Sequence, residues 1–353
     1  MKFKQKDLKN ILSIVCPLAN KNSVLPILNN LLIESKKDNI KFISTDLECV
    51  LEYNQLGEYK EDKYLIHSKT LQDYINLITD EDVELNFDKK CSIKSKTNKT
   101  NINLQKEDYP MLPNQIGGDE YEININDLKK AISQVMFASS TSDIRIELSG
   151  VCFIFGEELI LVSSDTMRLA EKKIKIKGKE NKVIIPSKTL TLLTNILSKI
   201  NDETIKIIVN KNNVSFKTKD ITLLSNLVNS EFPNYKAIIP EKSITEISVD
   251  KQELINSIKT NALFSQDGSI NLEINDKLII NTESSQGDNK SEIEIKKTGE
   301  DNKVVFNYLY LLEIVENINT KNINIKIIDK KSPVILEPEI NENYICILMP
   351  LNL

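Results

Sequence analysis

The sequence predicts an α+β protein assembled from three tandem copies of one unit of about 120 residues. Strand-like apolar runs lead into helical apolar patterns at residues 65–78, 184–197 and 305–318. The starts of a second set of helices, a set of strands and the proline-containing closing segments recur with the same period. We therefore expect each unit to hold two helices and many antiparallel strands, with the helices on one face of the sheet.

The helices are predicted from their apolar spacing and their first residues. Ser-Lys-Thr-Leu opens the helical part of the first two segments at Ser68 and Ser187, and Asn307 takes the same place in the third. Ser and Asn side chains accept hydrogen bonds from first-turn amides, so we expect them to be N-caps. The other helix of each unit begins at residues 6–8, 126–128 and 252–254, where amphipathic runs start.

Strands and closing segments complete each unit. Alternating segments predict strands at residues 40–46, 159–165 and 278–284. A segment that contains proline closes each copy, at Tyr109-Pro110, Phe232-Pro233 and Met349-Pro350. Gly117-Gly118 is the only Gly-Gly pair, and Pro240 to Ser243 follows the second closing segment. The predicted domains are residues 1–118, 119–241 and 242–353.

Composition excludes most familiar kinds of catalytic and metal site. The chain has one His, no Trp and five Cys, with no C-x-x-C pair, no H-E-x-x-H, no G-x-S-x-G and no glycine-rich nucleotide motif. We expect no cofactor and no metal. We predict that the cysteines are small core residues of a protein in a reducing cytoplasm. They are Cys16, Cys49, Cys91, Cys152 and Cys346.

Net charge and hydropathy limit the kinds of partner that the chain can have. Acidic residues number 51 and basic residues 46, a net charge of −5, which still permits a locally basic face for a polyanion. The apolar run before Cys16 is too short for a signal peptide, and no stretch reaches the ~18 apolar residues of a membrane span. We expect a cytoplasmic protein with no membrane partner.

Five motifs in order give the chain a family resemblance. They are Met1-Lys2-Phe3, Leu-Pro-Ile-Leu-Asn-Asn-Leu-Leu at 25–32, Ser-Asp-Thr-Met-Arg-Leu-Ala at 164–170, Phe-Pro-Asn-Tyr at 232–235, and Met-Pro-Leu-Asn-Leu at 349–353. Together, and across the whole chain, they resemble the bacterial DNA polymerase III beta subunit family, the sliding clamps.

The resemblance implies a DNA-clamp fold and a non-catalytic function in DNA replication. Three similar domains per chain would place helices on an inner face and antiparallel sheets outside, and two chains would close head to tail as a ring-shaped homodimer. The ring would encircle double-stranded DNA without sequence specificity and act as a processivity factor. The implied partners are the DNA polymerase III alpha subunit, the clamp loader, and other DNA polymerases and repair proteins that carry short clamp-binding peptides.

Lysines on the predicted helices are candidates for DNA contact. A ring that slides needs nonspecific phosphate attraction and no reading of base edges. The candidates on or beside the helices are Lys6, Lys9, Lys129, Lys130, Lys188, Lys199 and Lys259, and the resemblance adds Lys21 in a loop. The alternative is ordinary solvated charge, because the whole chain is rich in lysine.

Arginine is scarce enough to be informative. Only Arg145 and Arg168 among the 46 basic residues are arginine, and both lie in the second copy. A guanidinium offers planar, multi-donor hydrogen bonding that an ammonium lacks, so the pair indicates a site that needs this geometry. Two structural ion pairs are the alternative.

The resemblance assigns a partner-peptide pocket between domains two and three. An apolar cleft would take the Leu and Phe of a partner, while arginine and hydroxyl groups hold its polar atoms. The assigned positions are Arg145, Leu148, Ser164, Thr166, Met167, Arg168, Leu169, Pro233, Ala237, Ile238, Tyr310, Ile347, Met349, Pro350, Leu351 and Leu353. For the apolar members the alternative is plain interdomain core.

Four positions depart from the family pattern. Thr166 stands where glycine is usual, Met167 where histidine is frequent, Ala237 where a basic residue is common, and Asn352 in place of a terminal arginine. Each change removes charge or narrows a turn. We therefore expect peptide affinity and fine specificity to differ from those of the family.

The resemblance implies that Leu263 and Phe264, after the first helix of domain three, are apolar anchors of the dimer interface. The alternative is that both are core residues.

Two other functions stay open. One is a divergent clamp paralogue that serves repair or drug tolerance. The other is an enzyme with carboxylates at Asp46, Glu48 and Glu52, or at Asp165 with Glu171, although acidic residues on strands are usually solvated.

Overall fold

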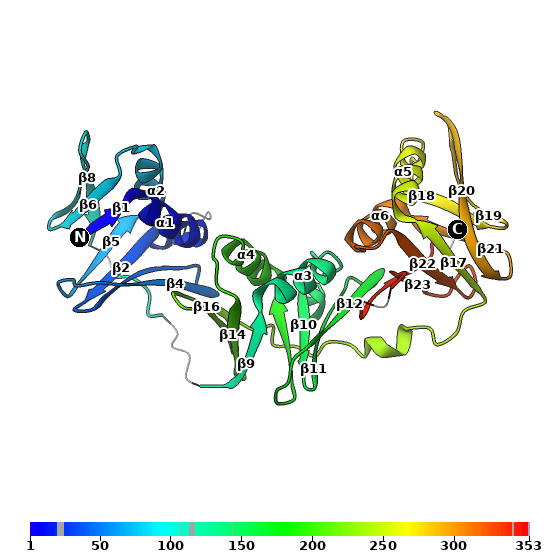
Figure 1. Ribbon diagram of the computed structural model, residues 1–353, viewed down its shortest axis with the longest axis horizontal. Coiled ribbons are helices and arrows are strands. Elements are labelled where there is room, and N and C mark those ends of the chain that lie inside the picture. Colours follow the sequence, from blue (N-terminus) through cyan, green and yellow to red (C-terminus); the bar gives the residue numbers. More distant parts are fainter. Residues whose placement is uncertain (20–24, 107, 113–116, 143, 341, 352–353) are drawn as a thin grey trace. The chain divides into compact units, whose positions relative to one another are not determined.

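The computed structural model describes residues 1–19, 25–106, 108–112, 117–142, 144–340 and 342–351. Internal packing divides the chain into two compact units. The first comprises residues 1–128 and 188–227, and the second comprises residues 129–187 and 228–353. In the described residues, each unit is built on one 12-stranded antiparallel sheet (Figure 1).

The sheet of the first unit combines strands from distant parts of the sequence. Its β4 pairs with β16, so that Val50 lies opposite Leu224. In spatial order the strands are β1 (Lys2–Lys4), β6 (Asp82–Phe87), β7 (Lys90–Lys94), β8 (Lys99–Gln105), β5 (Asp62–His67), β2 (Asn30–Lys36), β3 (Asn39–Thr45), β4 (Cys49–Leu56), β16 (Ile221–Asn226), β15 (Asn213–Lys217), β14 (Thr204–Val209) and β9 (Asp119–Asn124).

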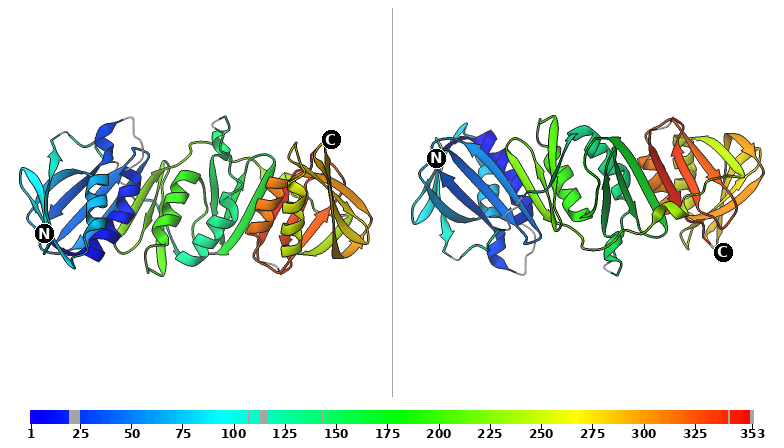
Figure 2. Two further views of the ribbon diagram at one scale, coloured as in Figure 1. Left: turned by 90° about the horizontal axis from the view of Figure 1, so that it is seen from above. Right: turned by 90° about the horizontal axis from the view of Figure 1, so that it is seen from below.

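Helices α1 (Gln5–Ala19) and α2 (Ser68–Leu77) pack against each other and against this sheet, as Figure 2 shows. Apolar residues at three- and four-residue steps, such as Leu8 and Leu12, are fully buried. Lys6 and Lys9 on the same helix are exposed. The third helix, α4 (Ser187–Leu197), lies in this unit from its second residue onward.

The sheet of the second unit repeats the same kind of junction. Its β12 pairs with β24, so that Leu169 lies opposite Ile347. In spatial order the strands are β13 (Asn181–Pro186), β10 (Gly150–Phe155), β11 (Glu158–Ser164), β12 (Arg168–Lys175), β24 (Tyr344–Leu348), β23 (Val334–Pro338), β22 (Asn322–Ile327), β17 (Thr245–Asp250), β20 (Gly287–Gly299), β19 (Lys277–Ser284), β18 (Ser269–Ile274) and β21 (Asn302–Asn307).

Helices α5 (Lys251–Ala262) and α6 (Tyr308–Asn317) pack against each other in the second unit, and α6 contacts β21 and β24. Helix α3 (Ile125–Met136) enters this unit at Lys129. Three short 3-10 turns occur in the described chain: η1 (Pro26–Asn29), η2 (Ile146–Leu148) and η3 (Tyr235–Ile238). The predicted helix and strand positions are thus confirmed to within about two residues.

The predicted caps are only partly correct. Asn307 accepts hydrogen bonds from the amides of Leu309 and Tyr310, as expected. The prediction for Ser68 is wrong, because α2 is capped by His67 and the Ser68 hydroxyl donates to the carbonyl of Asn29. Ser187 is likewise the first residue inside its helix. Local sequence could not reveal that tertiary acceptors take the serine hydroxyls.

The five cysteines are free and buried, as predicted. Burial raises the pKa of Cys346 to about 12, so its thiol stays protonated and unreactive at neutral pH. Among the described residues, no helix combines the length and apolar character of a membrane span.

Candidate functional site

The site is organised around the turn that leads into β12. One carboxylate oxygen of Asp165 accepts hydrogen bonds from the amides of Met167 (3.0 Å) and Arg168 (2.9 Å). The Ser164 hydroxyl donates to the carbonyl of Arg168 at 2.8 Å. Thr166 has φ 80°, a left-handed conformation that a β-branched residue seldom adopts. The turn therefore fixes the backbone position from which the Arg168 side chain extends.

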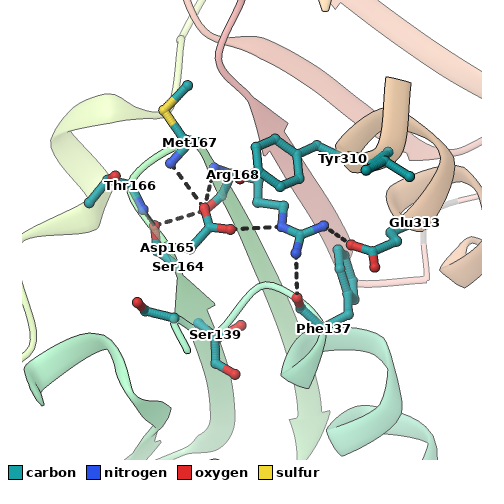
Figure 3. Close-up of polar contacts among 12 residues, drawn as sticks. Phe137, Ser139, Ser164, Asp165, Thr166, Met167, Arg168, Tyr310 and Glu313 are labelled. Carbon is teal, nitrogen blue, oxygen red and sulfur yellow. Dashed lines mark hydrogen bonds and ion pairs between the residues drawn. The ribbon is translucent and has the colours of Figure 1, made fainter. Parts of the chain in front are cut away.

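The Arg168 guanidinium is held from several directions (Figure 3). Its Nε donates to Asp165 Oδ2 at 3.0 Å, its Nη2 donates to the carbonyl of Phe137 at 2.9 Å, and its Nη1 donates to Glu313. The guanidinium also lies 4.5 Å from the ring centroid of Tyr310 and 5.3 Å from that of Phe137. Arg168 is 9% exposed. It adjoins Tyr310, another predicted pocket residue, and it forms the intrachain ion pairs that were the structural alternative.

Apolar residues gather beside this turn in one buried cluster. Three predicted pocket residues, Leu148, Leu169 and Ile347, belong to it and are all but fully buried. The other members are Cys152, Val162, Ile184, Phe232, Tyr235 and Ile335. The aromatic pair from the closing segment was not predicted to be part of the site. Their position around a proline was the available signal.

Tyr235 ties η3 to β12. Its hydroxyl donates to Glu171 Oε2 at 2.5 Å in a buried position. Burial, and then the bond to Glu171, raises the pKa of Tyr235 well above its ordinary value. Glu171, one of the carboxylates considered for catalysis, thus accepts a structural hydrogen bond.

The remaining predicted pocket positions fall into three groups. Pro233, Ala237 and Ile238 are exposed on or beside η3. The chain end is tied down on both sides, because the amide of Met349 donates to the carbonyl of Met167 and that of Leu351 to the carbonyl of Val305, each at 2.8 Å. Pro350 between them is buried. Leu353 and Asn352 lie outside the described residues.

Arg145 differs from Arg168 in its surroundings. It is exposed and immediately precedes η2, the turn that carries Leu148 into the apolar cluster. Next to the cluster, a cavity of about 950 Å³ is lined by residues of β10, β11 and β13, including Ile154 and Ile160. None of the predicted site residues in the described part of the chain lines it.

The predicted DNA-binding lysines differ in their contacts. Lys6 and Lys9 are exposed on α1, whereas Lys129 is half-buried on α3. Three lysines form ion pairs: Lys130 with Glu342 (3.0 Å), Lys259 with Glu316 (2.9 Å), and Lys188 with Glu48 (2.7 Å) and Asp46 (3.0 Å). Lys199 donates to the carbonyl of Ser13. Lys21 lies outside the described residues.

Lys188, at the start of α4, forms an ion pair with Asp46. Asp46 begins a turn of the first unit that corresponds to the Asp165 turn of the second. Asp46 accepts from the amides of Glu48 and Cys49, just as Asp165 does in its own turn. Burial lowers the pKa of Lys188, but the bonds to Glu48 and Asp46 outweigh this and raise it. The carboxylates considered for catalysis at Asp46 and Glu48 are therefore partners of a lysine, and Glu52 pairs with Lys41 at 2.9 Å.

The predicted interface residues follow α5. Leu263 is 76% exposed. Phe264 is half-buried, and its ring lies close to the backbone of Gly287.

Comparison with known proteins places the whole chain in one group. Residues 1–113, 122–234 and 236–352 match, in that order, the family models for the N-terminal, central and C-terminal domains of the DNA polymerase III beta subunit. A beta sliding clamp of Staphylococcus aureus is 26% identical over 350 residues, which is 93% of each chain. One of Chlamydia muridarum is 24% identical and covers 100% of this chain and 99% of its own.

Solved structures agree. The DNA polymerase III beta subunit of Thermotoga maritima has a TM-score of 0.94 and 26% identity, covering 100% of this chain and 99% of its own. A sliding clamp of Pseudomonas aeruginosa bound to griselimycin has a TM-score of 0.94 at 22% identity, with the same coverage, and supports the fold alone.

Proposed function

The chain belongs to the family of bacterial DNA polymerase III beta subunits, the beta sliding clamps, and on that premise we propose how its residues serve a clamp. Members of this family are non-catalytic processivity factors. The observation that carries the assignment is the match of all three domain models, in order, across almost the entire chain. The carboxylates once considered for catalysis have structural partners in the chain, which fits a protein that catalyses nothing.

Two chains close head to tail around double-stranded DNA and hold a polymerase on its template. Each chain supplies the predicted domains 1–118, 119–241 and 242–353. Leu263 and Phe264 contribute apolar contacts to the seam. The strong exposure of Leu263, a large apolar side chain, supports this role.

DNA is held by lysines on helices through nonspecific phosphate attraction. Lys6 and Lys9 on α1 are the best supported, because both side chains are exposed on one helix. Lys130, Lys188 and Lys259 already have carboxylate partners, so phosphate contact by these three requires exchange of an ion pair.

Partner proteins bind through short peptides at the Arg168 site of the second unit. The nearby apolar cluster, the exposed residues of η3 and the anchored chain end supply apolar surface, while Ser164, Thr166 and the two arginines supply polar groups. The partners are the DNA polymerase III alpha subunit, the clamp loader, other DNA polymerases and repair proteins. That the Pseudomonas aeruginosa clamp binds griselimycin supports a ligand site on this fold.

Fluorescence polarisation of a labelled short peptide that ends in Leu-Phe tests the site. The wild-type protein should bind it saturably. A variant that lacks residues 349–353 should lose binding, because the amide of Met349 donates to the carbonyl of Met167 in the Asp165 turn. A peptide with both apolar residues replaced by alanine is the control. Equal binding by the truncated and complete chains would remove the chain end from the site.

A further inference from the structure

The guanidinium of Arg168 is shared by two carboxylates. Asp165 holds Nε and Glu313 holds Nη1, so the three side chains together carry a net charge of about −1 at neutral pH. A carboxylate-bearing ligand that approached Arg168 would therefore meet a neutralised cation and a surplus negative charge.

The two carboxylates are not equally replaceable. Asp165 is 14% exposed and also accepts two backbone amides of its own turn, so removing it would break the turn. Glu313 is 50% exposed and comes from the separate helix α6 (Figure 3). With one partner half-exposed, this ion pair contributes less net stability than a fully buried pair, because water competes for Glu313 and two side chains lose freedom. Glu313 is therefore the carboxylate that a ligand can displace.

We propose that Glu313 occupies the place on the Arg168 guanidinium that an oxygen of a partner peptide would take, and so sets how acidic a partner peptide can be. The inference rests on the proposed function, because it assumes that peptides bind at Arg168. A peptide carboxylate near this arginine must either displace Glu313 or join two existing negative charges. A neutral amide oxygen at the same place meets less repulsion.

Helix α6 provides a matched control. Glu316 lies three residues after Glu313, is 46% exposed and pairs with the exposed Lys259 at 2.9 Å. Glu313→Gln and Glu316→Gln change the net charge equally, and only the first removes a carboxylate from Arg168. Glu313→Ala serves as a second variant without the amide, and thermal melting of each variant verifies its fold.

The probes are labelled short peptides that end in Leu-Phe and carry either Asp or Asn at each preceding position in turn, measured by fluorescence polarisation. At the position nearest Arg168, Glu313→Gln and Glu313→Ala should bind the Asp peptide about fivefold more tightly than wild type. The matching Asn peptide should change less than about twofold, and Glu316→Gln should leave both affinities near wild type.

Three outcomes would overturn the inference while the peptide site stands. They are no selective gain for any Asp peptide, weaker binding of both peptides by the Glu313 variants, and an equal gain in Glu316→Gln. The second would show that Glu313 holds Arg168 in place, and the third would show a general charge effect. If neither the wild type nor any variant binds a peptide, the proposed site itself fails, and the inference fails with it.

Discussion

At the residue scale, both units contain the same aspartate-capped turn, but a helix supplies a cation to this turn in the first unit and a carboxylate in the second. In the first unit, Asp46 caps its turn and binds a cation, Lys188, that comes from a helix. In the second, Asp165 caps its turn and binds a cation, Arg168, from that same turn, while helix α6 supplies a carboxylate. The scarcity of arginine pointed to Arg168 in the sequence. Its partner Glu313 was not predictable, because it lies 145 residues away and carries no motif.

The two arginines should differ sharply on truncation. Arg168→Ala leaves Asp165, which is 14% exposed, without its cation and empties the space beside two rings, so we expect a loss of about 2–3 kcal/mol in the free energy of unfolding. The half-exposed Glu313 keeps the loss below that of a fully buried pair. Peptide affinity should fall at least about tenfold with an unchanged native mass. Chemical denaturation and fluorescence polarisation measure the two effects.

Arg145→Ala is the control for this comparison. Arg145 is exposed, so its unfolding free energy should stay within about 0.5 kcal/mol of wild type. Normal peptide binding by Arg168→Ala would remove Arg168 from the proposed site.

At the element scale, periodicity predicted helices and strands better than it predicted their contacts. Apolar spacing located the six helices of the described chain, since amphipathic faces are local features. The cap of α2 was mispredicted because the Ser68 hydroxyl donates to Asn29, in a distant segment. The buried aromatic pair Phe232 and Tyr235 was missed because the residues packed around it, and the Glu171 partner of Tyr235, also come from distant segments. Leu148, Leu169 and Ile347 are buried, as expected if they are core residues. They lie in one cluster, and only the family resemblance had predicted that these three would lie together.

The bond between Tyr235 and Glu171 should make stability depend on alkaline pH. The raised pKa means that the folded state holds the phenol proton more tightly than the unfolded state, whose pKa is about 10. The bond therefore contributes fully below pH ~10, and its contribution declines as pH rises above that value.

Tyr235→Phe removes this bond. It should lower the unfolding free energy by about 1–2 kcal/mol at pH 7, and by progressively less above pH ~10. Urea denaturation across pH 7–11 measures the difference between the two proteins, in which the effects of the other tyrosines cancel. A constant difference over the whole range would contradict the assignment.

At the scale of the whole molecule, the threefold repeat and the family motifs together predicted the fold, whereas site details depended on tertiary contacts. The repeat is visible in sequence because each copy must form the same sheet and helices. Which lysines keep free charge was not visible, because Glu342, Glu48 and Glu316 come from elsewhere in the chain.

Charging the proposed seam should separate the dimer. Leu263→Lys combined with Phe264→Lys places two buried charges in an apolar interface, which is strongly unfavourable. Light scattering after gel filtration should give the monomer mass of 40.2 kDa, whereas the wild type should give twice that value. Lys297→Ala, elsewhere in the same unit, is a control. A dimer of unchanged mass would exclude both residues from the interface.

The most direct test of the sliding-clamp assignment is topological. The protein is loaded by its own clamp loader onto nicked circular DNA, and the complex is passed through gel filtration at about 0.5 M salt, where phosphate attraction is largely screened. We predict that the protein stays with the circle and is released when a single cut makes the DNA linear. Equal retention on linear and circular DNA, or loss from the intact circle at this salt concentration, would contradict encirclement.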